Sequence, residues 1–530
     1  KITQRVLRYQ KYLYTRGDIV PKTMRFDLKA ILTFSDELKG GEEDIDAIIS
    51  DSNSDLLRRG VPDHIQNGGA RVEAHSVEGR NLHMNITSDR YVRAHDAVIR
   101  LKKRLNQELG PEYHVGVRDV EIDSYTIKFE LDKEPKKDEK LELPYADDIK
   151  IKGKDCELNI SSLGEEELSK NYVDRIINRV NEKIDAQYYE GKEEMWNLQW
   201  ESEKKEMAWE EDPTEVMQER GWIKRGPTKG KWFYRPEAAK IIKTMEKIAI
   251  EEVLEPLGFQ EIMGSMMVPF DVWLETGHME GIPNEAYYIS EPKTRNPDEW
   301  EEIVDEIKIT REVPREKLEE MIKTPNAGVC YAQCPVIYWS FRNETIAEES
   351  LPVLIFDSTV PSTRYESGGR HGMERVDEFH RIEPVYIGTK DQLLELKEKL
   401  IDRYKHVFED IMDIEWRMAE VEPFYLQQAG GEEKEEETGL GTIDFEAYLP
   451  FRGSREDSEW LEFQNLSIFR KYTEAFNIKS QNEKLLSGCT GIGLERWTTA
   501  FLAQKGLDPE DWPEGFRGYF DGMPEGFELL

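Results

Sequence analysis

The chain has 530 residues, of which 38% are hydrophobic, and a formal net charge of −36. A chain of this length exceeds what one hydrophobic core organises, so we expect two or three domains. No stretch approaches the roughly 20 apolar residues that span a bilayer, and no apolar segment follows the charged N-terminus as in a signal peptide. With only four cysteines, the composition predicts a cytoplasmic protein with reduced thiols and no membrane partner.

The negative net charge repels nucleic acid at long range, but salt screens this repulsion. Local basic patches therefore determine whether the protein can bind nucleic acid. Residues 1–28 carry seven Lys or Arg against two Asp, and residues 100–104 hold four basic side chains. A solvated helix face is the favoured interpretation of residues 94–104 taken alone. An RNA contact at 1–28 and 94–104 is the functional alternative.

The predicted elements give an α+β protein. Residues 1–165 form an N-terminal α+β domain, with a helix over 94–110 that stops at Gly110–Pro111 and alternating strand-like residues over 115–131. Residues 166–220 are charged and are predicted to be a helical connector. The segment 221–236 is basic and turn-rich, and a long amphipathic helix follows Pro236. Residues 221–530 form one large domain of helices and strands.

The cysteines allow two interpretations. Cys330 and Cys334 lie in "GVCYAQCP" and Cys489 lies in "GCTGIGLERW", whereas Cys156 is isolated. A CxxxC pair is a weak metal signal, so three buried core cysteines remain an open alternative to a metal site.

Residues 351–389 contain a strand, a Gly-rich turn and a second predicted strand over 375–383. Arg364, Arg370 and Arg375 are planar donors that bind phosphate bidentately, and Phe379 offers a stacking face. A surface hairpin with Arg–Glu pairs is the alternative.

These residues resemble a known family. Arg364-x-Glu366 followed by Arg375-x-x-x-Phe379 resembles motif 2 of the class II aminoacyl-tRNA synthetases, and Gly491-x-Gly493-x-x-Arg496 resembles motif 3. Residues 256–269 resemble motif 1 more weakly. Residues 272–289 resemble the segment after motif 1 in seryl-tRNA synthetases, and the whole catalytic half is similar to the type 2 enzymes of methanogenic archaea. The resemblance implies a class II catalytic domain, an antiparallel sheet flanked by helices, over 221–530, and an α+β tRNA-binding domain before it.

The resemblance also implies site residues. It places one Zn²⁺ per chain on Cys334, Glu383 and Cys489, either with an open fourth position or with Cys330 as a fourth, structural ligand. It makes Arg364 and Arg496 catalytic and Glu462 a candidate for Mg²⁺ that accompanies ATP. The residues implied to bind ATP are Arg364, Glu366, Arg375, Val376, Phe379, Glu462 and Arg496. Those implied to bind serine are Ala332, Arg364, Arg381, Glu383, Gln428 and Asn465.

The function implied by the resemblance is ATP-dependent activation of L-serine and transfer to tRNA(Ser), and also to tRNA(Sec), by a homodimer. Three alternatives stay open. A threonyl-tRNA synthetase also uses zinc but through Cys-His-His ligands, which this sequence lacks at the matched positions. A paralogue that charges a carrier protein lacks the N-terminal domain. A non-catalytic RNA-binding relative has no chemical reason to keep the motif residues.

Overall fold

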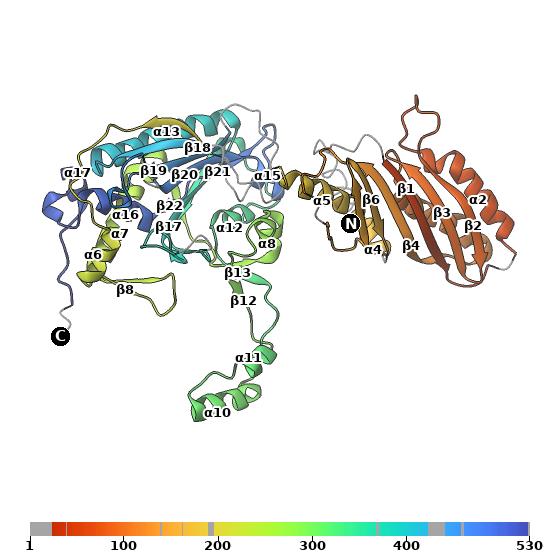
Figure 1. The fold of residues 1–530 in the computed structure, drawn as a ribbon, viewed down its shortest axis with the longest axis horizontal. Coiled ribbons are helices and arrows are strands. Elements are labelled where there is room, and N and C mark those ends of the chain that lie inside the picture. The colour runs from red at the N-terminus through yellow and green to blue at the C-terminus, as the bar shows by residue number, and fades with distance from the viewer. Residues whose placement is uncertain are drawn as a thin grey trace. The chain divides into compact units, whose positions relative to one another are not determined.

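The computed structural model describes residues 24–38, 40–137, 140–161, 163–188, 196–366, 370–421, 440–456 and 460–527. The chain divides into two compact units, Lys1–Lys192 and Glu193–Leu530 (Figure 1). All twelve tryptophans lie in the second unit, between Trp196 and Trp512. Gln428 and most of the basic segment 1–28 fall outside the described residues.

The first unit is built on a six-stranded antiparallel sheet with the strand order β2–β3–β1–β4–β6–β5. Every second residue of its central strand is buried, as expected for a sheet with one face on a core. The strands are β1 (Met24–Phe34), β2 (Ala70–Glu78), β3 (Asn81–Asp89), β4 (Val117–Glu130), β5 (Asp148–Lys152) and β6 (Asp155–Ile160).

Helices share the core of this unit with the sheet (Figure 1). They are α2 (Glu42–Ser54), α3 (Ala94–Tyr113), α4 (Glu165–Ser169) and α5 (Tyr172–Ala186), with a 3-10 turn η1 (Leu56–Arg58). Helix α3 confirms the predicted helical spacing, since Ala97, Leu101 and Leu105 are fully buried. It continues past the predicted stop because Pro111 lies in its last turn, where one missing backbone hydrogen bond is tolerated, and the Tyr113 hydroxyl donates to Asp44.

Three of the four basic residues at 100–104 in α3 have partners within the unit. The pairs are Arg100 with the Arg59 carbonyl (2.9 Å), Lys102 with the Glu165 carboxylate, and Arg104 with the Asp51 carboxylate (3.0 Å). These bonds tie α3 to neighbouring elements and agree with the favoured interpretation of residues 94–104, a helix face without an RNA contact.

The segment 166–220, expected to be a helical connector, is divided between elements of different kinds. Helix α5 buries Val173, Ile177 and Val180 in the first core, because its apolar residues recur at helical spacing. A strand, β7 (Trp196–Glu201), then pairs with a strand of the second unit, where Trp200 packs on Trp416 with ring centroids 4.5 Å apart.

The second unit is built on a nine-stranded sheet with the order β10–β14–β17–β21–β20–β19–β18–β7, and β22 pairs with β17 and β20. All of its pairings are antiparallel except β10–β14. The strands are β10 (Gln260–Ile262), β14 (Val353–Asp357), β17 (Arg381–Gly388), β18 (Trp416–Val421), β19 (Gly441–Ala447), β20 (Leu461–Phe469), β21 (Leu486–Cys489) and β22 (Ile492–Gly493).

Helices and turns complete this unit. Its main core combines the sheet with α6 (Pro213–Glu219), α7 (Pro236–Ile248), the π-helical turns η2 (Ala249–Leu254) and η6 (His406–Ile411), α13 (Lys390–Lys405), α16 (Leu494–Lys505) and α17 (Glu514–Arg517). A second cluster lies around α8 (Phe270–Glu275), α12 (Cys334–Trp339) and α15 (Lys471–Ala475). The remaining helices are α9 (His278–Gly281), α10 (Glu301–Thr310) and α11 (Arg315–Met321).

Three small sheets lie beside the large one. They are β11 (Met267–Pro269), β13 (Ala327–Val329) and β12 (Tyr288–Ile289); β15 (Ser362–Thr363) and β16 (Glu378–Phe379); and β8 (Ile223–Arg225) and β9 (Trp232–Tyr234). The strand predicted over 375–383 is interrupted at His380, whose backbone N–H donates to the Glu495 side chain (2.9 Å) instead of to a neighbouring strand.

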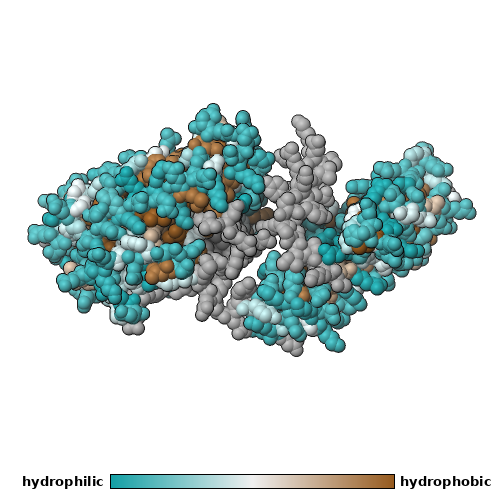
Figure 2. All heavy atoms as spheres, turned by 90° about the horizontal axis from the view of Figure 1, so that it is seen from above, coloured by the Kyte–Doolittle hydropathy of each residue, from teal (hydrophilic) through white to brown (hydrophobic). Residues whose placement is uncertain are grey.

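The face seen in Figure 2 is largely hydrophilic, with hydrophobic residues gathered over part of the larger unit on the left. Within the described ranges, no helix has the length and apolar character needed to cross a membrane.

Candidate functional site

Three buried side chains from separate elements meet at one point of the large sheet. Cys334 begins α12, Glu383 lies on β17 and Cys489 ends β21. Val385 of β17 is opposite Cys489 in the antiparallel register, so Glu383, two residues away, faces the same side as the thiol. Their potential ligand atoms all lie within 4.8 Å of one another. The structure therefore brings together the predicted metal-binding set.

The environment of Glu383 fits a bound cation. The side chain is fully buried, and neither carboxylate oxygen has a hydrogen-bond partner among the described residues. Arg381 Nε lies 2.5 Å from Oε2 in an ion pair. Burial raises the pKa of Glu383, and the hydrogen bond with Cys334 together with burial raises the pKa of Cys489. A buried carboxylate is costly unless positive charge compensates it. Arg381 supplies one such charge, and two thiolates with one carboxylate form a ligand set that suits zinc.

Cys330 is buried beside this set but is not part of the cluster of ligand atoms. Its backbone carbonyl accepts hydrogen bonds from the Thr363 N–H (2.7 Å) and hydroxyl (3.0 Å). The geometry therefore favours three protein ligands over four.

Two stacked tyrosine side chains pack beside the two thiols. The Tyr472 hydroxyl lies 3.4 Å from Cys334 Sγ, and its ring stacks on Tyr338 with centroids 4.5 Å apart. The Tyr338 hydroxyl donates to the Gly488 carbonyl (2.6 Å) and accepts from the Gly488 N–H (2.8 Å). These bonds fix the strand that ends in Cys489.

The two glycines of the G-x-G sequence differ in how closely neighbouring side chains approach them. A Cβ on Gly491 would lie 2.0 Å from Arg381 Nη2, whereas a Cβ on Gly493 would meet only ordinary contacts at 3.7 Å. The Gly491 N–H also donates to Asn465 Oδ1 (3.1 Å). Two predicted serine-binding residues, Arg381 and Asn465, thus contact Gly491 directly, between Cys489 and the start of α16.

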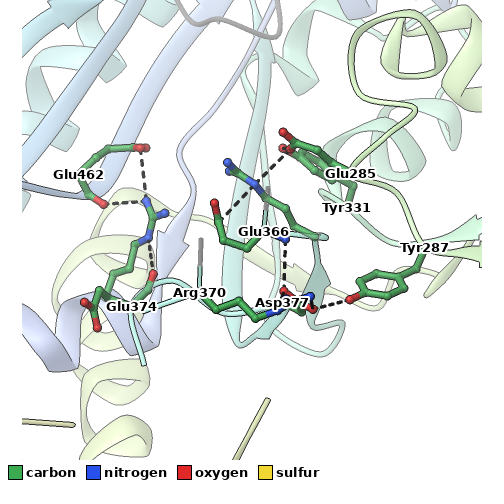
Figure 3. Close-up of polar contacts among 10 residues, drawn as sticks. Glu285, Tyr287, Tyr331, Glu366, Arg370, Glu374, Asp377 and Glu462 are labelled. Carbon is green, nitrogen blue, oxygen red and sulfur yellow. Dashed lines mark hydrogen bonds and ion pairs between the residues drawn. The ribbon is translucent and has the colours of Figure 1, made fainter. Parts of the chain in front are cut away.

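Arg364 belongs to a polar cluster with Glu285 and Glu366, which Figure 3 labels. Its Nε is 3.2 Å from Glu285 Oε2 and 3.7 Å from Glu366 Oε2. The Tyr331 hydroxyl donates to the same Glu285 carboxylate (3.1 Å), and burial raises the pKa of Tyr331 to about 12. The guanidinium is therefore oriented by two carboxylates, one from motif 2 and one from the segment before it.

Asp377 fixes the backbone on which Arg364 and Glu366 stand. Its carboxylate accepts two hydrogen bonds from Arg370 (2.9 and 2.7 Å), one from the Tyr287 hydroxyl (2.5 Å) and one from the Glu366 N–H (3.2 Å) (Figure 3). Its backbone carbonyl accepts from the Arg364 N–H (2.8 Å). Burial acts to raise the pKa of Asp377, but the hydrogen bonds from Arg370 and Tyr287 outweigh it and lower the pKa.

Arg496 extends from the first turn of α16, which begins at Leu494. Its Nη1 donates to the Glu462 carbonyl (2.7 Å) and lies 3.3 Å from Glu462 Oε2, and its Nε donates to the Glu374 carbonyl (3.2 Å) (Figure 3). The buried Glu374 side chain is in turn paired with Arg452. Arg496 thus bridges β20 and the motif 2 loop.

Comparison with known proteins decides the family. The chain is 44% identical over 511 residues to the type-2 serine–tRNA ligase of Methanococcoides burtonii, covering 96% of this chain and 100% of that protein. It is 42% identical to the type-2 serine–tRNA ligase of Methanothrix thermoacetophila, again over 96% of this chain and 100% of the relative. The chain belongs to the type-2 serine–tRNA ligases.

Two further matches agree with this family. Residues 24–182 match a family described as a tRNA-binding domain. The structure matches that of M. kandleri SerRS, solved in complex with A. aeolicus tRNA(Sec), with a TM-score of 0.83 and 30% identity over 96% of this chain and 99% of that chain. The predicted α+β class II architecture with an N-terminal tRNA-binding domain is confirmed.

The other residues predicted for this type-2 ligase lie close to these groups, with one exception. Ala332 is buried next to Tyr331, and Val376 is buried next to Asp377. The remaining two are half-buried: Arg375, whose backbone pairs with His371, and Phe379, on β16. Gln428 lies outside the described residues.

Sequence reasoning missed four residues: Glu285, Tyr287, Tyr331 and Asp377. Glu285 and Tyr287 lie in the segment 272–289, whose resemblance to seryl-tRNA synthetases was noted without assigning a role to either. No local pattern marks Asp377, because its partners come from segments as far apart as Tyr287 and Arg370.

Proposed function

We propose that this enzyme, an aminoacyl-tRNA synthetase of the serine type, activates L-serine with ATP and transfers the seryl group to the 3′ end of tRNA(Ser). The observation that carries the proposal is that Cys334, Glu383 and Cys489 lie together. The short segment that begins with Cys489 also contains Arg496, which contacts Glu462. The match of residues 24–182 to a tRNA-binding domain supports tRNA as the acceptor. The relative that was crystallised with tRNA(Sec) supports tRNA(Sec) as a second acceptor.

In the first step, a serine carboxylate oxygen attacks the α-phosphorus of ATP and pyrophosphate leaves. Positioning and charge stabilisation supply most of the catalysis in such a transfer. Arg364 holds the α-phosphate and the attacking carboxylate, and Glu366 accepts from the adenine amino group. Phe379 stacks on one face of the adenine, and Arg375 and Arg496 bind the terminal phosphates. Glu462 holds the Mg²⁺ that accompanies ATP.

In this proposal Cys334, Glu383 and Cys489 would hold a zinc ion. The ion would supply a Lewis acid that binds the α-amino group of serine and so helps to orient the amino acid. Arg381 balances the charge of Glu383, and Ala332, Asn465 and Gln428 complete the serine-binding residues. Because the ligand set contains no histidine, it favours serine over the threonyl-tRNA synthetase alternative.

Serine-dependent ATP–pyrophosphate exchange by zinc-replete enzyme tests the activation step. We expect exchange with serine and little with threonine. We expect Arg364→Ala to lower the exchange rate about 100-fold or more, because it removes a donor to the developing charge, while circular dichroism stays unchanged. An enzyme that exchanges only with threonine, or with no amino acid, contradicts the proposal.

Metal analysis tests the ligand set separately. Cys489→Ser should lower bound zinc well below one per chain, measured by mass spectrometry after dialysis. Cys330→Ser is the matched control, since Cys330 is equally buried but outside the cluster, and should retain the metal. Equal zinc loss in both variants would point to a four-ligand structural site.

A homodimer belongs to the same proposal. Met263, Met266 and Met267 of the motif 1 segment are exposed, and so is Leu274 of α8, which follows it. Exposed apolar side chains gathered in one segment are typical of a protein interface.

A further inference from the structure

The β8–β9 hairpin is a basic segment in an acidic protein. Residues 221–236, "GWIKRGPTKGKWFYRP", contain five Lys or Arg and no Asp or Glu, although the whole chain carries −36. The two strands pair antiparallel, with Lys224 opposite Phe233 and Arg225 opposite Trp232. The function proposed above gives this segment no role.

Contacts from the hairpin fix it against motif 2. The Gly230 carbonyl accepts from the Asp377 N–H (2.7 Å), and a Cβ on Gly230 would lie 2.5 Å from Asp377 Cγ. Trp232 Nε1 donates to the Gly372 carbonyl (2.8 Å). The Asp377 carbonyl in turn accepts from the Arg364 N–H. Asp377 therefore links the hairpin tip at Gly230 to Arg364, the residue proposed to hold the reacting carboxylate.

The other face of the hairpin is left to solvent. Lys224 and Phe233 form a cross-strand pair and therefore project from the same face. The Phe233 side chain is 65% exposed, and Lys224 and Lys229 are also exposed. Within the described parts of the chain, neither lysine makes a hydrogen bond or ion pair, in contrast to Lys102 and Arg104 of α3, which are paired. An exposed aromatic ring on the same hairpin as unpaired cations is a combination that binds single-stranded nucleic acid.

We propose that the β8–β9 hairpin binds the single-stranded 3′ end of the tRNA, with Phe233 stacking on a base and Lys224 and Lys229 contacting phosphates. The proposal rests on tRNA being the acceptor. The terminal ribose hydroxyl must reach the seryl carbonyl beside Arg364, so the 3′ end has to pass the motif 2 loop on which the hairpin tip rests. Its phosphates supply the negative charge that this hairpin complements in an otherwise acidic protein.

Phe233→Ala tests the stacking contact. The side chain is exposed, so the variant should fold, and Phe527→Ala is the matched control because Phe527 is 69% exposed. Loss of one base–aromatic stack predicts a rise in the Kd for tRNA(Ser), or a fall in kcat/KM for aminoacylation, of about tenfold. Serine-dependent pyrophosphate exchange should stay at the wild-type rate, because no tRNA takes part in it.

Salt dependence tests the phosphate contacts. Each phosphate contact on a single strand contributes about 0.7 to the slope of log K against log salt, so a Lys224→Ala, Lys229→Ala double variant should lose about 1.4 of that slope. Phe233→Ala should weaken binding without changing the slope. A double variant at exposed lysines elsewhere, Lys204→Ala with Lys484→Ala, is the control and should keep the wild-type slope.

A tRNA(Ser) transcript lacking its single-stranded 3′ end localises the contact. Wild-type enzyme and Phe233→Ala should bind this transcript equally weakly, because neither the stacking contact nor the phosphate contacts can form without the 3′ end. If wild-type enzyme charges tRNA(Ser) and Phe233→Ala matches Phe527→Ala, the hairpin proposal is overturned while the proposed function stands. If wild-type enzyme activates serine but neither binds nor charges tRNA(Ser), both fall.

Discussion

Asp377 shows how a residue at a position that the motif 2 pattern leaves unspecified can set the geometry of the residues that the pattern names. Its carboxylate and its backbone together contact Arg364, Glu366 and Arg370 as well as Tyr287. It touches neither proposed substrate and acts through Arg364 and Glu366, so it is a positioning residue.

Asp377→Asn should lower kcat/KM for ATP in pyrophosphate exchange about 10- to 100-fold. The amide cannot accept both Arg370 bonds, and a small displacement of Arg364 is enough to lose that much rate. Asp27→Asn removes an ion pair on the exposed face of β1 and should leave exchange unchanged. Wild-type kinetics in Asp377→Asn would mean that Arg364 is held by Glu285 alone.

Gly491→Ala and Gly493→Ala separate two explanations of the G-x-G sequence. If both glycines merely allow the backbone to approach ATP, both substitutions should raise KM for ATP. The contact with Arg381 predicts instead that Gly491→Ala raises KM for serine and weakens zinc binding, while Gly493→Ala stays near wild type. Steady-state exchange kinetics with each substrate varied, and a zinc competition assay, distinguish the two.

The sequence predicted a residue's role in the site where a family motif names that residue. It did not predict the role of a residue that only tertiary contacts bring to the site. Cys334, Glu383 and Cys489 are far apart in the chain, and no spacing rule joins them. Only the resemblance predicted that they would meet. Glu285 and Tyr331 carried no such mark, because their roles arise from tertiary contacts: Glu285 pairs with Arg364 and accepts a hydrogen bond from Tyr331.

At the scale of elements, periodicity predicted the existence of helices well and their boundaries less well. The spacing of Ala97, Leu101 and Leu105 identified α3, but tertiary contacts extended the helix through Pro111 to Tyr113. The strand β7 was missed because its tryptophans resemble those of an amphipathic helix, and pairing with β18 decides its conformation. The break at His380 depends on Glu495, which follows it by more than a hundred residues.

The pairing of the α3 cations changes what their removal should do. Lys102→Ala and Arg104→Ala should change tRNA affinity less than twofold, because both side chains already serve Glu165 and Asp51. They should instead lower the stability of the first unit by about 1 kcal/mol or less each, as partly exposed ion pairs do. Filter binding and urea denaturation followed by far-UV circular dichroism measure the two effects. Affinity that falls with each charge removed would restore α3 as an RNA contact.

At the scale of the whole molecule, the proposed homodimer makes a prediction about mass. Met267→Asp combined with Leu274→Asp places two charges among exposed apolar residues of the motif 1 region and should give monomers in sedimentation velocity at micromolar concentration, where the wild-type enzyme is a dimer. Tyr145→Asp, at an exposed aromatic residue of the first unit, is the control and should remain dimeric. A wild-type monomer would contradict the homodimer.

The uneven distribution of tryptophan gives the protein a built-in optical label. Because all twelve indoles lie between Trp196 and Trp512 and none lies in the first unit, emission excited near 295 nm reports on one unit only. RNA bound solely by residues 24–182 should leave that emission unchanged, whereas RNA whose end reaches Trp232 should quench it. A single titration in a cuvette can therefore tell anchoring of the tRNA from delivery of its end to the catalytic unit.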